Sequence, residues 1–545
     1  MSDDRRPSGG DDTTNVYVRN TAVMTAGTIL SRATGLVRVA AIAYALGVLT
    51  PVAAAYLTAN TAPNILYELV LGGILTSVFL PVFVGWRHDH GRTEAWQVAD
   101  RAFTFAGIAL VAVALIGIVL APEIVRFYRI RDPAQAELAT FLLRWFMPQA
   151  VFYGIGAIAG GVLNAEGRFA APMFAPVLNN LAVIAALIAV ASIGLDEAGS
   201  VDDLTGAQRL LLGAGTTFGV VAMTMALWPS LRAAGYRWRP RLDLRHPAVR
   251  RLVQLSTWVL VYVAANQVAY ALIVRYTNDL DDARGKIAAY NIGFLIFSLP
   301  HAVFAVSVIT ALLPAMADRW AAGDRAGVIR SFSRGLRDTS VVMLPAAFGL
   351  AALALPISRL LLERGLTGTT DVVVVGDVLL AFAVGLPFFS AFQLLTRTFY
   401  AMQDSRTPAL TNVVSAVVQV AASLTYAFVL DLDVQGMAFG HATSYAVGTA
   451  ILLVRLRSTA GRLDGRRIAA TLIRVVPVAV VTAAAAYAVA ETLGAHGPSP
   501  SVGAQLAQVV AAVLTGMLVF AGLASIVGVR EVRDIAATLR RRFRG

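Results

Sequence analysis

The sequence predicts an all-α polytopic membrane protein with about 14 transmembrane helices, built as two six-helix lobes followed by two further helices. Three observations lead to this fold class. Of the 545 residues, 57% are hydrophobic and only 14% are charged, and the mean hydropathy is +0.68. Apolar runs long enough to cross a hydrocarbon core of ~30 Å as helices recur along the chain. An ordered series of residues also repeats at an offset near 235.

Composition and charge exclude several classes of function. The polar segments between the apolar runs are too short to hold a soluble catalytic domain, so we expect no enzyme activity. The net charge of +12 comes from 44 Arg and one Lys, most of them in short loops, which indicates membrane topology and not binding of nucleic acid. The chain has no Cys, so disulfides and Cys-ligated metals are excluded, and we expect no cofactor or metal site.

Breaks at Pro, Gly or clustered charges divide the apolar runs into fourteen spans. Residues 1–15 are polar and are expected to form a disordered tail. The second and eighth spans exceed a perpendicular crossing, and Pro63 and Pro300 are expected to bend them. The predicted spans are 22–48, 52–86, 102–124, 136–164, 169–195, 207–231, 248–275, 287–317, 338–361, 376–402, 408–430, 434–455, 470–491 and 504–529.

The distribution of basic residues predicts the orientation. The termini and the even-numbered loops hold 33 of them, whereas the odd-numbered loops hold nine. The remaining three, Arg32, Arg38 and Arg144, lie inside spans. Because Lys and Arg accumulate on the cytoplasmic side, both termini are expected to be cytoplasmic.

Two span ends and two turns match across the repeat. The second span ends in LTSVFLPVFVGW (75–86), and the eighth ends in VITALLPAMADRW (308–320). The turn NAEGRFAAP (164–172) matches YAMQDSRTP (400–408), and we align Arg168 with Arg406. Just beyond these turns, Leu178-Asn179-Asn180 matches Leu410-Thr411-Asn412.

A repeat of six helices predicts parallel lobes, because an even number returns the chain to the side where it started. Such lobes commonly enclose a substrate at their interface and alternate access to it. The predicted parts are an N-lobe (16–235), a C-lobe (236–460), helices thirteen and fourteen (461–530) and a basic tail (531–545).

Arg32 and Arg38 in the first span are the strongest functional candidates, because a charge at bilayer depth is costly unless it meets protein, water or a partner. They lie about 120° apart around an ideal helix, with Gly35 between them to allow a bend. Arginine donates paired hydrogen bonds to phosphate oxygens, which predicts an anionic substrate. The alternative for Arg32 is that it reaches to the lipid headgroups.

Five further polar residues of the spans are candidate substrate-binding residues: Asn60, Asn64, Glu68, Asn266 and Gln267. The first three are spaced four apart and therefore share one face of the second span. The last two fall at the duplicate position of Arg32. The alternative is that the amides hold helices together and that the carboxylate pairs with an arginine.

Asp404, Arg406 and Arg168 lie in even-numbered turns of the two repeats, where the lobes must close on the cytoplasmic side. We assign them to a gate or to energy coupling. The alternative is a salt bridge or a helix cap in a tight turn.

At these residues the sequence resembles the MurJ (MviN) family of lipid II flippases, within the multidrug/oligosaccharidyl-lipid/polysaccharide exporter group. The matching pieces are SRATGLVR (31–38), the Pro63-Asn64 pair, NAEGRFAAPMFAP (164–176), LLERGLT (361–367) and FYAMQDSRTP (399–408). They follow one another in family order.

The resemblance implies fourteen helices, with the last two forming a groove for a polyprenyl tail. It implies a flippase of peptidoglycan biosynthesis in the bacterial cytoplasmic membrane. Its substrate would be lipid II, the undecaprenyl-pyrophosphate-linked disaccharide-pentapeptide, moved from the inner to the outer leaflet. Arg32 and Arg38 match arginines taken to meet the pyrophosphate, and Asp404 matches a position associated with cation coupling.

The same resemblance implies that Na+, H+ or the membrane potential drives the transport. The implied partners are lipid II or a similar polyprenyl-pyrophosphate glycolipid, membrane lipids and cell-wall synthesis proteins. Three charges that the family often carries are absent, because this chain has Ala54, Tyr67 and apolar residues around Leu295. The alternatives are a flippase for another polyprenyl-linked oligosaccharide and a cation-coupled drug exporter. A cation exporter should place carboxylates in its cavity, whereas the first span here carries arginines.

Overall fold

The computed structural model is helical throughout its ordered elements and divides into two compact units. The structure describes residues 10–69, 80–194, 200–243, 247–280, 285–495, 501–529 and 531–532. Unit 1 comprises Met1–Leu46, Thr58–Arg126 and Asp132–Val263, and unit 2 comprises Gly47–Leu57, Phe127–Arg131 and Ala264–Gly545. Two short segments of the predicted N-lobe therefore belong to the second unit.

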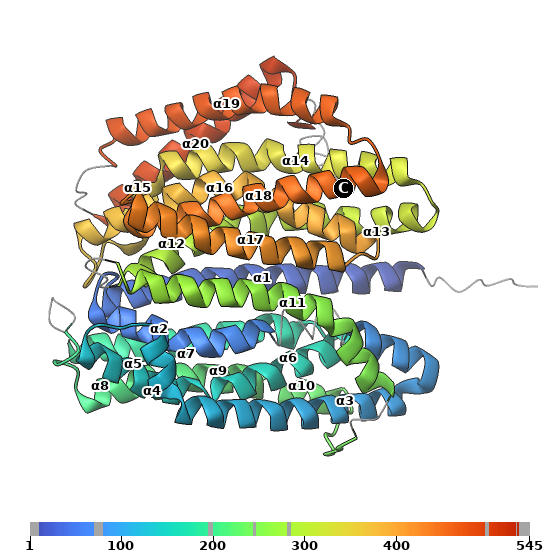
Figure 1. Ribbon diagram of the computed structural model, residues 1–545, viewed down its shortest axis with the longest axis vertical. Helices are drawn as coiled ribbons and strands as arrows, with labels where there is room; N and C mark the ends of the chain where they lie inside the picture. The colour runs from blue at the N-terminus through green and yellow to red at the C-terminus, as the bar shows by residue number, and fades with distance from the viewer. Residues whose placement is uncertain are drawn as a thin grey trace, which may run out of the picture. The chain divides into compact units, whose positions relative to one another are not determined.

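Unit 1 is a bundle in which α1 packs along α7, α3 packs on α6, and α7 packs on α9 (Figure 1). Phe83, Phe103 and Leu163 lie in the buried cluster that joins α3 to α6. The helices up to the end of this unit are α1 (Gly10–Leu46), α2 (Pro51–Glu68), α3 (Leu80–Val119), α4 (Ala121–Phe127), α5 (Pro133–Phe146), α6 (Gln149–Ala165), α7 (Ala170–Ile193), α8 (Gly206–Leu210), η2 (Leu211–Gly215), α9 (Thr216–Met225) and α10 (Trp228–Ala233).

Unit 2 is organised around α16 and α18, which pack against each other, while α17 covers α18 and α14 lies between α16 and α19. Gly440 and Gly448 allow α18 to approach its neighbours, because an added Cβ would collide with Ser423 and with Phe392. Its helices are α11 (Pro247–Thr277), whose start belongs to unit 1, α12 (Lys286–Pro300), η3 (His301–Ala305), α13 (Val306–Ala321), α14 (Arg325–Ala352), α15 (Ala354–Leu362), α16 (Thr369–Ala401), α17 (Arg406–Leu424), η4 (Thr425–Val429), α18 (Asp433–Ala460), α19 (Gly465–Thr492) and α20 (Val502–Val527).

The prediction of an all-α polytopic membrane protein is confirmed. Twelve helices among the described residues are long and apolar enough to cross a membrane, and α14 with α15 forms one more span that bends by 70° at its break. The predicted second span, 52–86, is described as α2 and the start of α3, and its middle lies outside the described residues. The predicted count of about 14 therefore agrees with the structure only approximately.

The breaks within spans differ in part from those expected. α2 continues through Pro63 to Glu68, whereas Pro300 is followed directly by the π-helical turn η3. The predicted fourth span is divided into α5 and α6, with Met147 and Pro148 between them. A proline lacks the backbone N–H that a continuous helix needs, so Pro148 accounts for this division.

The repeat is visible in the turns α6–α7 and α16–α17. Gly167 has φ +71° and Gln403 has φ +60°, so both turns use a left-handed residue at the same place. The helices before and after these turns end and begin at the same spacing of 236 residues. This spacing aligns Arg168 with Asp404, and our alignment of Arg168 with Arg406 was therefore wrong by two residues.

Candidate substrate site and the polar cluster of unit 1

Arg32 and Arg38 both lie on α1, which runs through Gly35 without interruption. Their side chains therefore leave the helix about 120° apart. Arg32 is exposed, and Arg38 is half-buried. The Nε atom of Arg38 is buried and has no hydrogen-bond partner in the part of the chain that the structure describes. Buried donors are nearly always paired, so this guanidinium is open to an anionic ligand.

The position of α1 is set by α7, which runs beside it in the same direction. An added Cβ at Gly27 would collide with the Met173 side chain, and Asn180 Nδ2 donates to Thr34 Oγ1 at 3.0 Å. Both contacts join residues that are 146 positions apart. A residue of α1 therefore lies level with the α7 residue 146 positions later, and Arg32 lies level with position 178.

The predicted polar face of α2 is formed. Asn60 is half-buried and its Oδ1 atom has no hydrogen-bond partner among the described residues, whereas Asn64 and Glu68 are exposed. No ion pair of Glu68 is found in the described ranges, so the suggested pairing with an arginine is not formed within them. The face presents amide and carboxylate groups that are available for binding.

A pocket of about 210 Å³ lies in unit 1, lined by residues of α2, α6, α7 and α9. The rings of Tyr67 and Tyr153 lie 4.4 Å apart on its wall, tilted by 47°. Asn164 also lines the pocket, and its buried Oδ1 has no donor within the described residues. Gly156 and Gly160 leave the α6 wall free of side chains. Sequence reasoning missed this pocket, although the Gly-rich stretch 154–161 is a signal for an open helix face.

Asn266 and Gln267 lie in unit 2, where both are half-buried on α11. Asn412 Nδ2 on α17 donates to Asn266 Oδ1 at 3.0 Å. Asn266 is thus used to join two helices, as our alternative interpretation had it. This pair lies 232 residues after the Thr34 and Asn180 pair, so Asn266 is the counterpart of Thr34 and not of Arg32.

The three predicted gate residues are placed in or beside the two repeated turns. Asp404 Oδ1 accepts a hydrogen bond from the Thr407 backbone N–H at 2.9 Å, which caps the start of α17. Arg168 donates from Nη2 to the Ala233 carbonyl at 2.8 Å and so joins the α6–α7 turn to the end of α10. Arg406 is exposed at the first position of α17.

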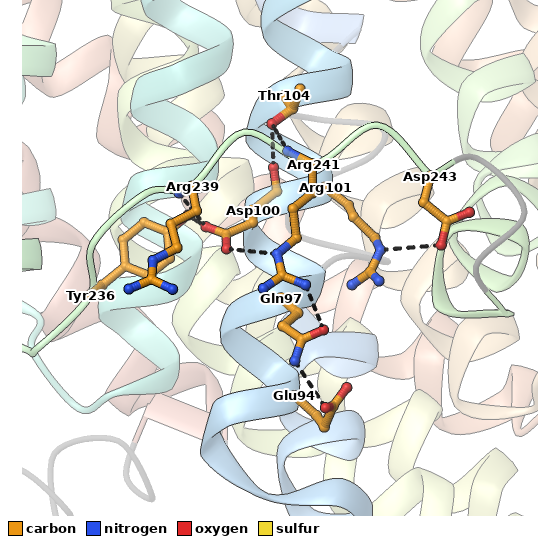
Figure 2. Close-up of polar contacts among 9 residues, drawn as sticks. All are labelled: Glu94, Gln97, Asp100, Arg101, Thr104, Tyr236, Arg239, Arg241 and Asp243. Carbon is orange, nitrogen blue, oxygen red and sulfur yellow. Dashed lines mark hydrogen bonds and ion pairs between the residues drawn. The ribbon is translucent and has the colours of Figure 1, made fainter.

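A buried carboxylate that we did not predict fixes the connection between α10 and α11 (Figure 2). The Asp100 side chain on α3 is only 5% exposed. It accepts hydrogen bonds from the Tyr236 hydroxyl at 2.8 Å and the Arg239 backbone N–H at 3.0 Å, and Arg241 Nε lies 3.7 Å away. Burial and the hydrogen bond to Asp100 raise the pKa of Tyr236 above its usual range. Tyr236 therefore remains a neutral donor.

Further contacts extend this α3 cluster along the same connection, as Figure 2 shows. Arg241 receives support on two sides, since its backbone N–H donates to Thr104 Oγ1 at 3.1 Å and its Nη1 donates to Gln97 Oε1 at 3.0 Å. Arg101 pairs with Asp243 at 3.6 Å. The α10–α11 connection, which leads out of the repeat's first copy, is thereby held on α3.

Glu166 ties the α6–α7 turn to the same end of α3. Its side chain is 7% exposed and pairs with Arg87 at 3.0 Å and with Arg92 at 2.8 Å. Arg92 also donates to the Ala234 carbonyl at 2.6 Å. The basic residues that predicted topology thus also hold three loops of unit 1 together.

Two units of membrane-length helices, with an unpaired guanidinium nitrogen inside one of them, define a multi-pass membrane transporter. The fold is shared with solved transporters. A structure described as lipid II flippase MurJ in an inward closed conformation has a TM-score of 0.75 at 19% identity, covering 94% of this chain and all of that chain. An inward-facing multidrug resistance MATE family transporter has a TM-score of 0.64 at 13% identity, covering 83% and 98%.

The chain belongs to the family of lipid II flippases named MurJ, because residues 42–502 match the model of that family. A probable lipid II flippase of Rhizobium meliloti is 29% identical over 75% of this chain and 75% of its own length. A lipid II flippase of Burkholderia cenocepacia is 28% identical over 79% of this chain and 82% of its own length. The family match begins after Arg38, so it covers α2 but neither of the α1 arginines.

Proposed function

We propose that this chain moves lipid II from the inner to the outer leaflet of the bacterial cytoplasmic membrane, and so supplies peptidoglycan synthesis. The names of its relatives support the substrate. Within the chain, the observation that carries the proposal is Arg38, whose buried Nε atom has no partner among the described residues. A pyrophosphate supplies the oxygens that such a fork of donors requires.

A flippase for another polyprenyl-linked oligosaccharide shares this requirement and is the second candidate. A cation-coupled drug exporter is favoured less, because the α1 residues inside the membrane are arginines and the α2 face offers one carboxylate, Glu68. Cationic drugs are bound by carboxylates, so the sign of the charge favours an anionic lipid.

We place the polyprenyl tail beside α19 and α20 of unit 2. Two apolar pockets support this placement. One, of about 560 Å³, is lined by residues of α14, α16, α18 and α19, among them Phe348 and Leu472. The other, of about 410 Å³, is lined by residues of α14, α19 and α20, among them Met517 and Phe520. A long hydrocarbon chain gains free energy when such surface covers it.

We further propose cytoplasmic termini, in keeping with the basic residues of the even-numbered loops. A gradient of Na+ or H+, or the membrane potential, would supply the energy for alternating access. Membrane lipids and cell-wall synthesis proteins are the proposed partners besides the substrate.

The test is reconstitution of the full chain in liposomes that contain lipid II, with measurement of the lipid II that becomes accessible in the opposite leaflet. Each gradient is imposed and collapsed in turn. We expect transport by the wild type, loss of transport in Arg38→Ala, and no change in Arg126→Ala, which alters an arginine exposed on α4. Failure of the wild type to move lipid II under every gradient would refute the proposal.

A further inference from the structure

The pocket of unit 1 formed by α2, α6, α7 and α9 is the feature that the family assignment leaves without a role. Its chemistry is mixed. Tyr67 and Tyr153 offer aromatic faces, Asn164 offers an unpaired amide oxygen, and Thr224 offers a hydroxyl oxygen. A pocket lined in this way by aromatic rings and a few polar groups is typical of a small-molecule site.

The polar groups of the pocket are suited to a ligand that carries hydroxyl or amide N–H donors. Asn164 Oδ1 accepts no hydrogen bond from the described residues. Thr224 Oγ1 donates to the Phe152 carbonyl at 2.9 Å, and its lone pairs remain able to accept. Both oxygens are acceptors in want of a donor, and an anionic group would be repelled there.

The pocket also has room for a ring. Its volume of about 210 Å³ is more than ten times the roughly 15 Å³ that one water molecule needs. Gly160 contributes no side chain, and a Cβ added there would lie 3.8 Å from Pro172 Cβ, which is an ordinary contact. A larger side chain at position 160 would therefore extend into the pocket without a collision at its first atom.

The position of the pocket relative to the α1 arginines follows from the α1–α7 register. Arg32 lies level with position 178 of α7, and Pro176, which lines the pocket, lies two residues before that level. Two residues correspond to about 3 Å along a helix. The pocket and Arg32 are thus at nearly the same depth in unit 1, and Tyr67 precedes Glu68 of the polar α2 face.

We infer that this pocket is a subsite for the sugar that is attached directly to the pyrophosphate of the substrate. This inference rests on the proposed function. A sugar ring has apolar C–H faces that lie against aromatic rings and hydroxyl groups that donate to amide oxygens. Because the sugar is bonded to the phosphate, a sugar subsite must lie beside the phosphate-binding residues. The pocket has the required chemistry at the required depth.

The subsite is tested with two lipids that differ only in the sugar-peptide part, namely lipid II and undecaprenyl pyrophosphate. Binding of each to the purified full-length protein in detergent is measured. Asn164→Leu removes the acceptor and Gly160→Leu fills the pocket while leaving every polar group in place. We expect each variant to bind lipid II about five- to tenfold more weakly, the effect of one lost hydrogen bond with its packing, and to bind undecaprenyl pyrophosphate as the wild type does.

Arg38→Ala is the comparison, because it should weaken binding of both lipids, and Arg126→Ala is the control that should weaken neither. If the pocket variants lose both lipids equally, the pocket holds the prenyl chain or only maintains the fold, and the sugar subsite is refuted. Unchanged binding of lipid II in both variants would refute it as well. A wild type that binds neither lipid would instead refute the proposed function, so the two failures are distinguishable.

Discussion

Asn412 on α17 donates from Nδ2 to Oδ1 of Asn266 on α11 at 3.0 Å, and it thereby repeats, 232 residues later, the bond from Asn180 to Thr34 at 3.0 Å. The two copies use the same helix pair but different acceptors. In unit 1 the acceptor is a hydroxyl, and in unit 2 it is an amide. The duplication therefore preserves an amide donor between its first and fifth helices.

We expect Asn412→Ala and Asn180→Ala to lower the thermal stability of the detergent-solubilised protein. Hydrogen bonds between membrane helices contribute about 0.6 kcal/mol on average and up to about 1.7 kcal/mol. The check is a double-mutant cycle with Asn266→Ala, measured by thermal unfolding. If the effects of Asn266→Ala and Asn412→Ala simply add, the two side chains do not interact, and the shared bond is not a stabilising feature.

The Tyr236 hydrogen bond to Asp100 predicts a pH dependence of stability. The pKa of Tyr236 is raised in the folded state, whereas in the unfolded chain it is about 10. A raised folded pKa means that the stabilisation is complete below pH ~10 and is lost as the pH rises above it. We expect Tyr236→Phe to lower the unfolding temperature at pH 8, and the difference from the wild type to shrink at pH 10.5.

Tyr44→Phe is the matched control for this experiment, since Tyr44 is 53% exposed on α1. It should leave the unfolding temperature unchanged at both pH values. A constant difference between Tyr236→Phe and the wild type from pH 8 to pH 10.5 would contradict the assigned hydrogen bond.

Asp404 allows its two interpretations to be separated, because asparagine caps a helix about as well as aspartate does. Asp404→Asn should retain the hydrogen bond to the Thr407 N–H and hence the thermal stability, whereas Asp404→Ala should lose about 1 kcal/mol. If the carboxylate charge also serves the gate, Asp404→Asn slows lipid II transport and leaves binding nearly unchanged. Transport at the wild-type rate would leave Asp404 only its capping role.

Hydropathy and periodicity were sufficient to predict the fold class, because each membrane helix must satisfy its own backbone hydrogen bonds and so announces itself as a long apolar run. The α3 cluster could not be predicted in the same way. Asp100 lies just before a predicted span, and its partners Tyr236, Arg239 and Arg241 lie some 140 residues later in a loop. Which loop meets which helix end depends on packing, which a charge count does not contain.

The residues of the candidate site were predicted by type but not by environment. An arginine at the position of Arg38 is costly in any membrane helix, and the sequence alone shows this. That its Nε is buried and unpaired depends on the α7 side chains beside it. For Asn266, the same reasoning favoured a substrate role equally with a helix contact, and only the position of Asn412 decided between them.

The topology prediction is tested by labelling single cysteines, because the chain has no Cys of its own. A membrane-impermeant thiol reagent added to whole cells should label a cysteine at Ser200 and should not label one at Ala233 or Gly323. The reason is the excess of basic residues in the even-numbered loops. Labelling at Ala233 in intact cells, with none at Ser200, would reverse the assigned orientation.

The final prediction concerns the chemistry of Arg38. Lysine restores the charge of Arg38→Ala but presents a single point donor where arginine presents a planar fork, so it matches a pyrophosphate less well. We expect Arg38→Lys to recover little of the lipid II binding lost in Arg38→Ala. The loss of one charge-assisted paired contact corresponds to on the order of 2 to 3 kcal/mol, which is roughly 30- to 150-fold in affinity. The measurement is binding by protein of matched abundance and unfolding temperature, with Arg126→Lys as the control. Because Arg38 Nε has no partner among the described residues, the substitution should leave stability nearly unchanged. Full binding by Arg38→Lys would show that charge alone suffices there, and full binding by Arg38→Ala would remove the physical argument for an anionic lipid.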